Sequence, residues 1–273
     1  MEKFIKELTE LGLQQGLHTP EQAAIVLCKF AETFPFENLD VLNQIEAEIT
    51  PEFLQEKLLQ SSRGGLCYEI NSLLYLILKQ LKFNVSIGIG TVNKEGNWAT
   101  DRTHAMVLLT MNDKKYIADG GYGNRLALYP LELDGSIVTS PAGSFRLRTV
   151  KTEKGSIALE MQNQRGDWDV HYAFDWNPEP WQELNRIKQD IHHHANSGFN
   201  KKPLIASVFR NGTQSINEER LSRKWSDGRE EEMVFQTKDD FFKTIRSFYT
   251  ASLTNEAEKV LKKLYHDEWN TKN

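Results

Sequence analysis

Cysteine is scarce in this chain of 273 residues, which contains only Cys28 and Cys67. Two cysteines are too few for a disulfide framework or a cysteine-rich zinc site. Their scarcity favours a reducing, cytoplasmic environment, in which a free reactive thiol would persist. The sequence also lacks an apolar stretch of ~18 residues without charges, so no membrane-spanning helix is expected. The start of the chain shows no apolar signal-peptide core, which agrees with the cytoplasmic expectation.

Basic residues are in the minority. The chain has 33 Lys and Arg against 38 Asp and Glu, a formal net charge of -5 and a pI near 5.9. A nucleic-acid-binding protein needs a basic surface to neutralise phosphates, so nucleic acid is not expected as the main partner. The remaining composition, 39% hydrophobic and 26% charged, is ordinary for a globular protein. The sequence gives no indication of an oligomeric state.

Helical signals dominate residues 1–83. Thr19-Pro20 and Thr50-Pro51 each place an N-capping threonine before a proline, the arrangement that starts a helix. After Cys67, an apolar stripe at helical spacing extends to Leu81 and predicts a core helix. Such a helix would hold Cys67 rigidly at its start.

From residue 84 the apolar residues alternate with small or polar ones, as they do in strands. Turn signals containing glycine, asparagine or aspartate separate the candidate strands. These features predict a small antiparallel barrel or sheet over residues 84–178. The expected strands cover residues 102–110, 114–119, 144–150, 156–162 and 168–175.

The pattern changes again near Pro178, and residues 179–273 mix strands with helices. The fold class is therefore expected to be α+β. No flexible linker or internal repeat separates the three regions, so we expect them to pack together. The elements expected in the third region are helices over 180–194, 238–248 and 254–267 and strands around 204–210, 213–224 and 231–236.

The segment Arg63-Gly64-Gly65-Leu66-Cys67 leads into the expected core helix. A helix N-terminus carries unpaired N–H groups and partial positive charge, and both stabilise a thiolate, the nucleophilic form of cysteine. Gly64 and Gly65 would allow a tight turn and the close approach of a substrate. A cysteine in this position is also commonly a small buried hydrophobe, so the motif alone leaves both interpretations open.

A hairpin between residues 102 and 119 supplies a candidate base and a carboxylate. If Asn112-Asp113 forms a two-residue turn, Met106 faces Asp119, and His104 is the diagonal neighbour of Asp119 on the same face. Diagonal neighbours lie ~7–8 Å apart between backbones, a gap that side chains can bridge. The carboxylate could then bind one imidazole nitrogen and leave the other to face Cys67. The alternatives, a structural histidine and a turn-forming aspartate before two glycines, stay open.

These three residues suggest covalent catalysis through a thioester. His104 would take the thiol proton, Asp119 would orient the imidazole and support its charged form, and Cys67 would attack an activated acyl group. The backbone N–H of Cys67 is a candidate donor to the tetrahedral oxyanion.

Four motifs together resemble those of the arylamine N-acetyltransferases. They are Pro35-Phe36-Glu37-Asn38-Leu39-Asp40, Arg63-Gly64-Gly65-Leu66-Cys67, Thr103-His104 before an apolar strand, and Asp119-Gly120-Gly121-Tyr122-Gly123. They occur in the family's order and with its approximate spacing. The resemblance implies a papain-like or transglutaminase-like cysteine core. It also implies a helical domain over 1–83, a β-barrel domain over 84–178 and an α/β lid over 179–273.

The resemblance implies a ping-pong reaction. Acetyl-CoA acetylates Cys67, CoA leaves, and an arylamine, arylhydrazine or arylhydroxylamine takes the acetyl group. His104 would be the base and Asp119 the orienting acid, with no metal. Arg63 and Glu37 resemble a buried ion pair that shapes the site. The residues that the resemblance assigns to the ligands are Phe36 in the acceptor pocket and Thr103, Gly121 and Gly123 on the CoA side.

The sequence departs from the family's pattern after the aspartate. Gly120 stands where a small apolar residue is commoner, and the proline-rich stretch is thinned to Tyr129-Pro130-Leu131. The run Arg223-Lys224-Trp225 could touch CoA phosphates or form a solvated strand edge. The adjacent histidines His192-His193-His194 point to different helix faces, so a metal site is not expected there. Cys28 is expected to be inert core.

Two further functions stay open on the sequence. The same three residues could serve a cysteine hydrolase or a transglutaminase-like acyltransferase with another acceptor. The chain could also be a catalytically silent protein that binds CoA or aromatic ligands.

Overall fold

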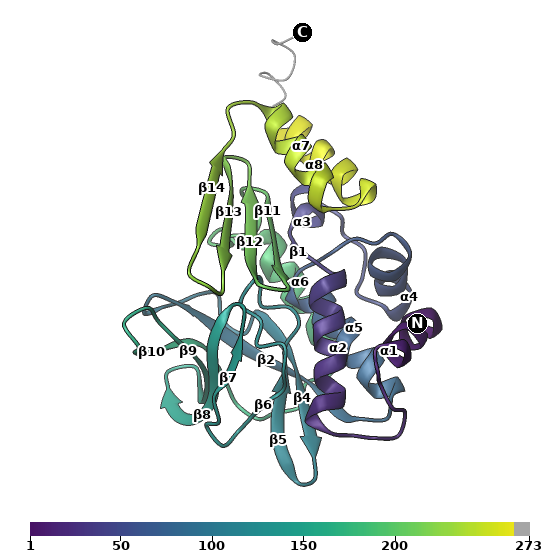
Figure 1. The fold of residues 1–273 in the computed structure, drawn as a ribbon, viewed down its shortest axis with the longest axis vertical. Helices are drawn as coiled ribbons and strands as arrows, with labels where there is room; N and C mark the ends of the chain where they lie inside the picture. The colour runs from purple at the N-terminus through teal and green to yellow at the C-terminus, as the bar shows by residue number, and fades with distance from the viewer. Residues whose placement is uncertain (265–273) are drawn as a thin grey trace.

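The computed structural model describes residues 1–264, which form three successive regions of secondary structure (Figure 1). N-terminal helices pack against a near-closed antiparallel sheet, and a second sheet with two helices follows at the C-terminal end. This confirms the expected α+β fold. The division into domains at residues 83 and 178 stays a prediction. In the described part of the chain, no helix is long and apolar enough to cross a membrane.

The N-terminal region is helical, as expected. Thr19 accepts a hydrogen bond from the backbone N–H of Gln22 (3.5 Å), and Thr50 accepts one from that of Phe53 (3.2 Å), so both predicted N-caps form. The elements are α1 (Glu2–Glu10), α2 (Pro20–Thr33), β1 (Phe36–Glu37), α3 (Leu39–Asn43), α4 (Pro51–Leu54), the π-helix η1 (Gln55–Gln60) and α5 (Cys67–Gln80).

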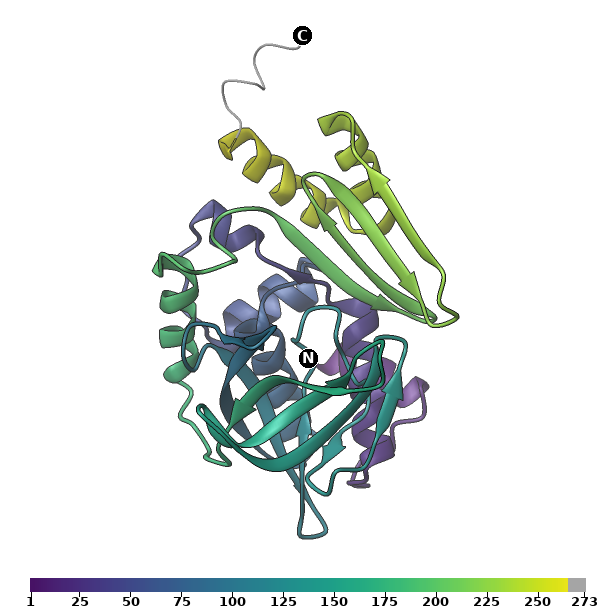
Figure 2. The ribbon, with the colours of Figure 1, turned by 90° about the vertical axis from the view of Figure 1, so that its left-hand side faces the viewer.

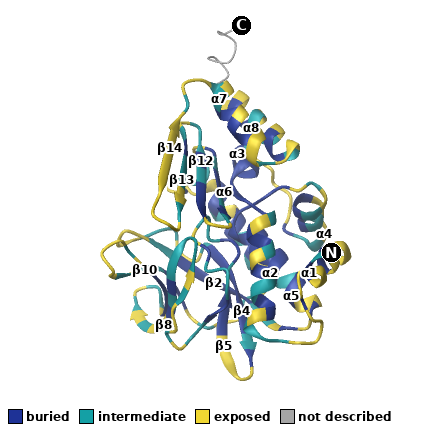
Figure 3. Ribbon diagram, in the orientation of Figure 1, coloured by how far each residue is buried: buried dark blue, intermediate teal, exposed yellow. Residues whose placement is uncertain are grey.

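Helix α5 is the central helix of the core. Its residues Leu73, Leu74, Ile77 and Leu78 are fully buried, because their spacing aligns them on faces covered by the sheet and by α2. Figure 3 shows this burial along α2 and α5. The helix that begins at Cys67 is therefore held firmly on several sides.

The central sheet contains nine strands, all paired antiparallel, in the order β6-β5-β4-β2-β10-β9-β8-β7, with β3 paired to β2. Most of its strands lie where the alternating pattern predicts them. Their bounds are β2 (Asn84–Lys94), β3 (Asn97–Trp98), β4 (His104–Met111), β5 (Lys114–Ala118), β6 (Leu131–Glu132), β7 (Val138–Ser140), β8 (Gly143–Thr152), β9 (Gly155–Gln162) and β10 (Trp168–Phe174).

The hairpin of β4 and β5 has the register expected from its turn. Val107 pairs with Ala118, and the pairing continues to the turn at Asn112-Asp113. Both turn residues have positive φ, 49° and 60°, as a type I′ turn requires. Asp119 lies directly after β5, so this register brings it beside the start of β4.

The C-terminal region follows the predicted order with two differences. The strand expected over 213–224 is two strands, because Asn217 accepts hydrogen bonds from the N–H groups of Glu219 and Arg220 (2.8 and 2.9 Å) and closes a turn. The last helix begins earlier than expected, and residues 265–267 of the expected helix lie outside the described part. The elements are α6 (Glu183–His193), β11 (Leu204–Phe209), β12 (Gly212–Asn217), β13 (Arg220–Trp225), β14 (Glu230–Val234), α7 (Lys238–Phe248) and α8 (Ala251–Leu264).

The three regions are connected by strand pairing and by a shared hydrophobic core. Strand β1 extends the second sheet, whose order is β1-β11-β12-β13-β14, by pairing Phe36 with Ala206. Helix α6 buries Leu184 and Ile187 in the same core as the N-terminal helices. Figure 2 shows α6 alongside the central sheet and the second sheet above it. The segments after residue 178 are thus placed next to the start of α5.

Candidate active site

Cys67 is the first residue of α5 and is 5% exposed. The chain before it is fastened to the segment 35–37: the N–H of Gly65 donates to the Pro35 carbonyl (3.2 Å), and the N–H of Glu37 donates to the Gly65 carbonyl (3.0 Å). A Cβ on Gly64 would lie 1.9 Å from the Pro35 oxygen, so only glycine permits this approach. Two of the sequence motifs thereby form one support for the thiol.

The three residues expected at the centre of the site lie together. His104 begins β4, and its Nε2 lies 2.7 Å from Asp119 Oδ2. Cys67 Sγ donates to the Thr103 carbonyl at 3.5 Å. Burial acts to lower the pKa of His104, but the charge of Asp119 and the interaction with Cys67 outweigh it and raise that pKa to about 10. Since Nε2 faces the carboxylate, Nδ1 is the ring nitrogen left for the thiol.

Asp119 has four polar partners. Besides His104, these are Asn71 Nδ2 at 2.8 Å, the N–H of Gly121 at 2.9 Å and the hydroxyl of Tyr172 at 3.0 Å. Burial acts to raise the pKa of Asp119, but His104 and these hydrogen-bond donors hold it below its ordinary value. The carboxylate is therefore ionised and fixed in position.

Asn71 is a site residue that the sequence reasoning missed. It lies four residues after Cys67 on the same face of α5, and its amide donates to both Asp119 and the Ala105 carbonyl (2.8 Å each). Its Oδ1 accepts from the N–H of Gly120 at 2.8 Å. A polar residue in an otherwise apolar helix stripe was the signal that could have identified it.

Tyr172 was also missed, and no sequence signal marks it. A β-bulge between Val170 and Tyr172 makes His171 an extra residue in β10 and turns Tyr172 toward the site. The Tyr172 ring lies 4.8 Å from the His104 ring, and the side chain is fully buried. Tyr172 therefore fixes both the imidazole and the carboxylate.

A cavity of about 100 Å³ opens onto Cys67 and His104. Gly121 closes one side: a Cβ there would lie 2.8 Å from the Cys67 Cα, so glycine lets the loop lie against the nucleophile. Segments from all three regions contribute to the wall. The expected ligand residues Phe36, Thr103 and Gly121 line the cavity, together with Lys94, Tyr122, Ile191 and Phe199, whereas Gly123 does not.

A buried charge cluster lies under the start of α5. Arg63 donates to Glu37 (2.7 and 2.9 Å) and to Asp40 (2.7 Å), so the expected ion pair forms. The structure adds Lys57, whose Nζ lies 2.8 Å from Asp40 and 2.6 Å from Glu69. Burial acts to lower the pKa of Lys57, but these carboxylates outweigh it and raise it. Glu69 also accepts from the N–H of Leu66 (2.9 Å), so the cluster holds the helix start in place.

Replacing Arg63 by methionine should lower the free energy of unfolding by about 3–5 kcal/mol, because Glu37 and Asp40 would then be buried without their partner. Urea unfolding followed by circular dichroism measures this change. The matched control is Arg220→Met, which breaks an exposed pair with Glu232 and should lower the free energy of unfolding far less, because solvent screens that pair. Equal losses in the two variants would contradict the proposed importance of burial.

Cys28 and the histidine run at residues 192–194, both noted in the sequence, lie away from this centre. Cys28 is exposed, whereas the sequence predicted a core residue. Its position on α2 directs the side chain away from the side of the helix that buries Leu27 and Phe30. The Cys28 Sγ lies 3.6 Å from the Leu128 carbonyl. His192 is buried beside the hydroxyl of Tyr68 (3.3 Å). Within residues 1–264, no group of three or more His, Cys, Asp or Glu could hold a metal.

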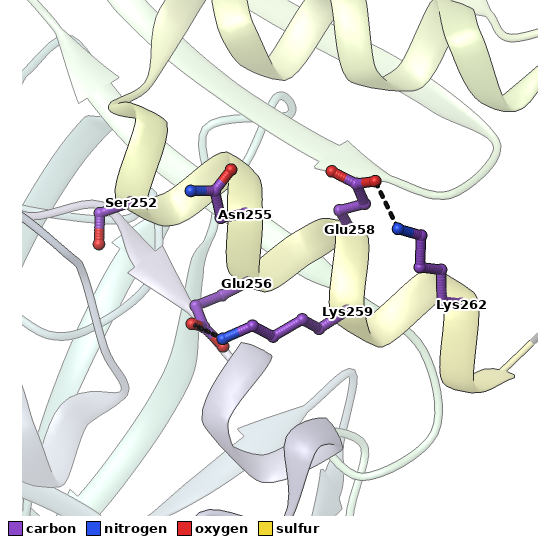
Figure 4. Close-up of a pocket in the computed structure, with 6 residues that line it drawn as sticks. All are labelled: Ser252, Asn255, Glu256, Glu258, Lys259 and Lys262. Carbon is purple, nitrogen blue, oxygen red and sulfur yellow. Dashed lines mark hydrogen bonds and ion pairs between the residues drawn. The ribbon is translucent and has the colours of Figure 1, made fainter.

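The strand edge at Arg223-Lys224-Trp225 pairs with glutamates of β14, with Lys224 Nζ 2.7 Å from Glu230. These residues line neither the Cys67 cavity nor the hollow on α8 (Figure 4). That hollow, of about 370 Å³, is bordered by the exposed pairs Glu256–Lys259 (2.7 Å) and Glu258–Lys262 (2.8 Å). It contains none of the three central residues and has the character of a solvated helix face.

Comparison with known proteins identifies the family and relatives of this chain. The family model described as N-acetyltransferase matches residues 23–258. The chain is 37% identical over 222 residues to the uncharacterised acetyltransferase YvcN of Bacillus subtilis, covering 80% of this chain and 87% of that protein. The structure of arylamine N-acetyltransferase C from Bacillus anthracis superposes with a TM-score of 0.83 at 32% identity, covering 90% and 96% of the two chains.

A second solved structure concerns the acidic residue that pairs with the catalytic histidine. An arylamine N-acetyltransferase from Bacillus cereus, reported to have a unique Cys-His-Glu catalytic triad, is 32% identical, with a TM-score of 0.82 and coverage of 91% and 96%. In the present chain an aspartate contacts the histidine. The family model, the relatives and the fold agree, and the chain belongs to the arylamine N-acetyltransferase family.

Proposed function

We propose that this protein transfers the acetyl group of acetyl-CoA through Cys67 to an aromatic amine, hydrazine or hydroxylamine. The observation that carries the proposal is the buried His104–Asp119 pair beside a cysteine at a helix start, in a chain of this family. A cytoplasmic setting is part of this proposal, since two cysteines among 273 residues are too few for a disulfide framework.

The first half-reaction acetylates the enzyme. His104 accepts the thiol proton of Cys67, and the sulfur attacks the thioester carbonyl of the donor. The N–H of Cys67, at the positive end of α5, supports the oxyanion. The intermediate collapses as the C–S bond to CoA breaks, and the imidazolium returns its proton to the leaving thiolate. Acetylated Cys67 and free CoA result.

The second half-reaction releases the acetyl group. The amine nitrogen attacks the carbonyl of acetylated Cys67, His104 takes the proton from the nitrogen, and the Cys67 sulfur leaves and recovers a proton. Asp119 keeps Nε2 of His104 engaged throughout, so Nδ1 faces the reacting atoms. Asn71 and Tyr172 act as positioning residues because they touch the acid and the base and not the substrate.

An aromatic acceptor fits the apolar wall of the cavity. Phe36 and Phe199 pack edge to face with ring centroids 5.6 Å apart, and Tyr122 and Ile191 complete a narrow, largely apolar space. Such a space suits a flat ring better than a peptide amine. We assign Phe36 to the acceptor wall and Thr103, Gly121 and Gly123 to the donor side. A Mycobacterium marinum arylamine N-acetyltransferase, 22% identical with a TM-score of 0.76, has been crystallised with CoA.

Initial-rate kinetics test the acceptor and the order of the steps. With acetyl-CoA and a substituted aniline as the varied substrates, double-reciprocal plots should give parallel lines, because CoA leaves before the amine reacts. Acetate formed without the amine should be a minor product. Acetate as the sole product would instead indicate the hydrolase alternative, and acetylation of a protein amine in preference to the aniline would indicate the transglutaminase-like one.

A further inference from the structure

The helix that begins at Cys67 is capped by a carboxylate from its own first turn. Leu66 occupies the N-cap position of α5, where its apolar side chain offers no acceptor. Glu69 takes over this task, because its Oε2 accepts from the N–H of Leu66 at 2.9 Å. A Cβ on Gly65 would lie 2.6 Å from the same oxygen, so glycine leaves room for the carboxylate. Glu69 is buried and therefore fixed at the helix end that carries the thiol.

This capping carboxylate opposes the ionisation of the thiol. The N-terminus of a helix acts as roughly +0.5 elementary charge, and this charge favours a thiolate. A carboxylate in the same turn cancels that positive charge and repels a second anion. Cys67 and Glu69 both lie in the first turn of α5. A cation held against Glu69 would therefore keep the cap and remove its effect on the thiol.

Lys57 is the cation in that position. Its Nζ donates to Glu69 Oε1 at 2.6 Å and lies 2.8 Å from Asp40 Oδ2, so it contacts the oxygen of Glu69 that the cap leaves open. The Phe53 ring covers the ammonium group, with its centroid 5.9 Å from Nζ. Lys57 is only 6% exposed, so water screens its charge little. Burial raises the pKa of Glu69, and the charge of Lys57 opposes this rise.

The other ionisable groups around this pair do not replace Lys57. The groups that face it from the neighbouring elements are Glu37 on β1, Asp40 on α3, Arg63 before α5, Tyr68 on α5 and Lys188 on α6. Arg63 is bonded to Glu37 and Asp40, and Lys188 donates to the Ala47 carbonyl. Burial raises the pKa of Tyr68, so its hydroxyl stays neutral. In the described part of the chain, the ion pair with Lys57 is the one that Glu69 makes.

We propose that Glu69 and Lys57 form a charge-compensated cap, in which Glu69 fixes the start of α5 and Lys57 cancels the charge of Glu69 at the Cys67 thiol. Both are positioning residues, because neither lines the cavity that contains Cys67. This inference rests on the proposed function, in which Cys67 is the nucleophile. It requires effects of opposite sign: loss of the carboxylate should favour thiolate formation, and loss of the ammonium group should oppose it.

The test is the pH profile of Cys67 alkylation by iodoacetamide in the full-length protein, which needs neither acyl donor nor acceptor. In Glu69→Gln, the pH of half-maximal alkylation should fall by about one unit, as expected for the loss of a nearby negative charge. Glutamine is close to glutamate in shape and keeps an oxygen that can accept from the N–H of Leu66. In Lys57→Met, the same pH should rise by about one unit.

Two further variants separate charge from structure. The double variant Lys57→Met/Glu69→Gln removes both charges, so its profile should return to that of the unmodified protein. A structural defect alone would not give shifts of opposite sign that cancel when combined. The matched control is Lys243→Met, which breaks an exposed lysine–carboxylate pair with Asp239 on α7 (2.9 Å) and should leave the profile unchanged.

Opposite shifts in the two single variants that cancel in the double variant support the compensated cap. Shifts of the same sign, or an unshifted profile in either single variant, would overturn it. If unmodified protein is still acetylated on Cys67 by acetyl-CoA in that case, the proposed function stays intact. Unmodified protein in which Cys67 reacts no faster than Cys28 would refute Cys67 as the nucleophile, and this inference with it.

Discussion

Replacing Asp119 by asparagine is expected to lower acetyl transfer by about 10,000-fold while the fold is retained, which is the loss seen when a triad carboxylate becomes an amide. The carboxylate accepts from His104 Nε2 at 2.7 Å and carries the negative charge that supports the imidazolium. An amide is neutral and can present a donor to Nε2, so His104 would adopt the wrong tautomer. Turnover of an aniline with acetyl-CoA measures the loss.

The pH dependence of Cys67 alkylation gives a second test of the role of Asp119. The pKa of His104 is raised to about 10, so the ion pair stabilises the fold fully below the ordinary histidine pKa of ~6.5, and this stabilisation is lost as the pH rises through 10. Without the charge of Asp119, burial would act unopposed and lower the pKa of His104. Alkylation of Cys67 by iodoacetamide should therefore lose its neutral-pH reactivity in Asp119→Asn.

The control for this variant is Asp227→Asn, which removes an exposed carboxylate paired with Arg229. Its turnover should equal that of the unmodified protein. A decrease below about tenfold in Asp119→Asn, or an unchanged pH profile of alkylation, would show that Asp119 is a structural residue only.

Replacing Cys67 by alanine should reduce acetyl transfer by at least about 1,000-fold, because Cys67 is the only cysteine among the described residues that line the cavity with His104. Serine at this position should also be inactive at neutral pH, since an alcohol is a far weaker nucleophile than a thiolate. The alanine substitution removes the weak contact from Sγ to the Thr103 carbonyl and the interaction of the thiol with His104. Urea unfolding should therefore show a small stability change, which separates lost chemistry from lost structure.

Cys28→Ala is the matched control for the thiol. Cys28 is exposed on α2, and its sulfur contacts only the Leu128 carbonyl among its described hydrogen-bond partners. Turnover should be unchanged. If both cysteine variants kept their activity, the covalent route through Cys67 would be wrong.

Local sequence chemistry predicted much of the fold around the site. The Asn112-Asp113 turn accommodates two residues with positive φ, and this alone fixes the register of β4 and β5. The threonine caps and the apolar stripe of α5 are local patterns too, so they were visible along the chain. The position of His104 near Asp119 followed directly from that register.

Contacts between segments that are distant in the sequence were harder to predict. Lys57 enters the charge cluster through η1, and helical patterning does not distinguish a buried lysine from an exposed one. Tyr172 reaches Asp119 because of a bulge at His171, a feature of strand pairing that the alternating pattern does not encode. The exposure of Cys28 depends on which faces of α2 the sheet and α1 cover, and this too is set by tertiary packing.

The most direct measurement of the central claim is peptide mass spectrometry after a single exposure to acetyl-CoA. The protein should gain the mass of one acetyl group on the peptide containing Cys67, and adding an aniline should remove it while acetylated aniline forms in equal amount. Asp119→Asn should acquire the adduct far more slowly, and Cys67→Ala should not acquire it. No adduct on Cys67, or an adduct that an aniline does not consume, would contradict the account.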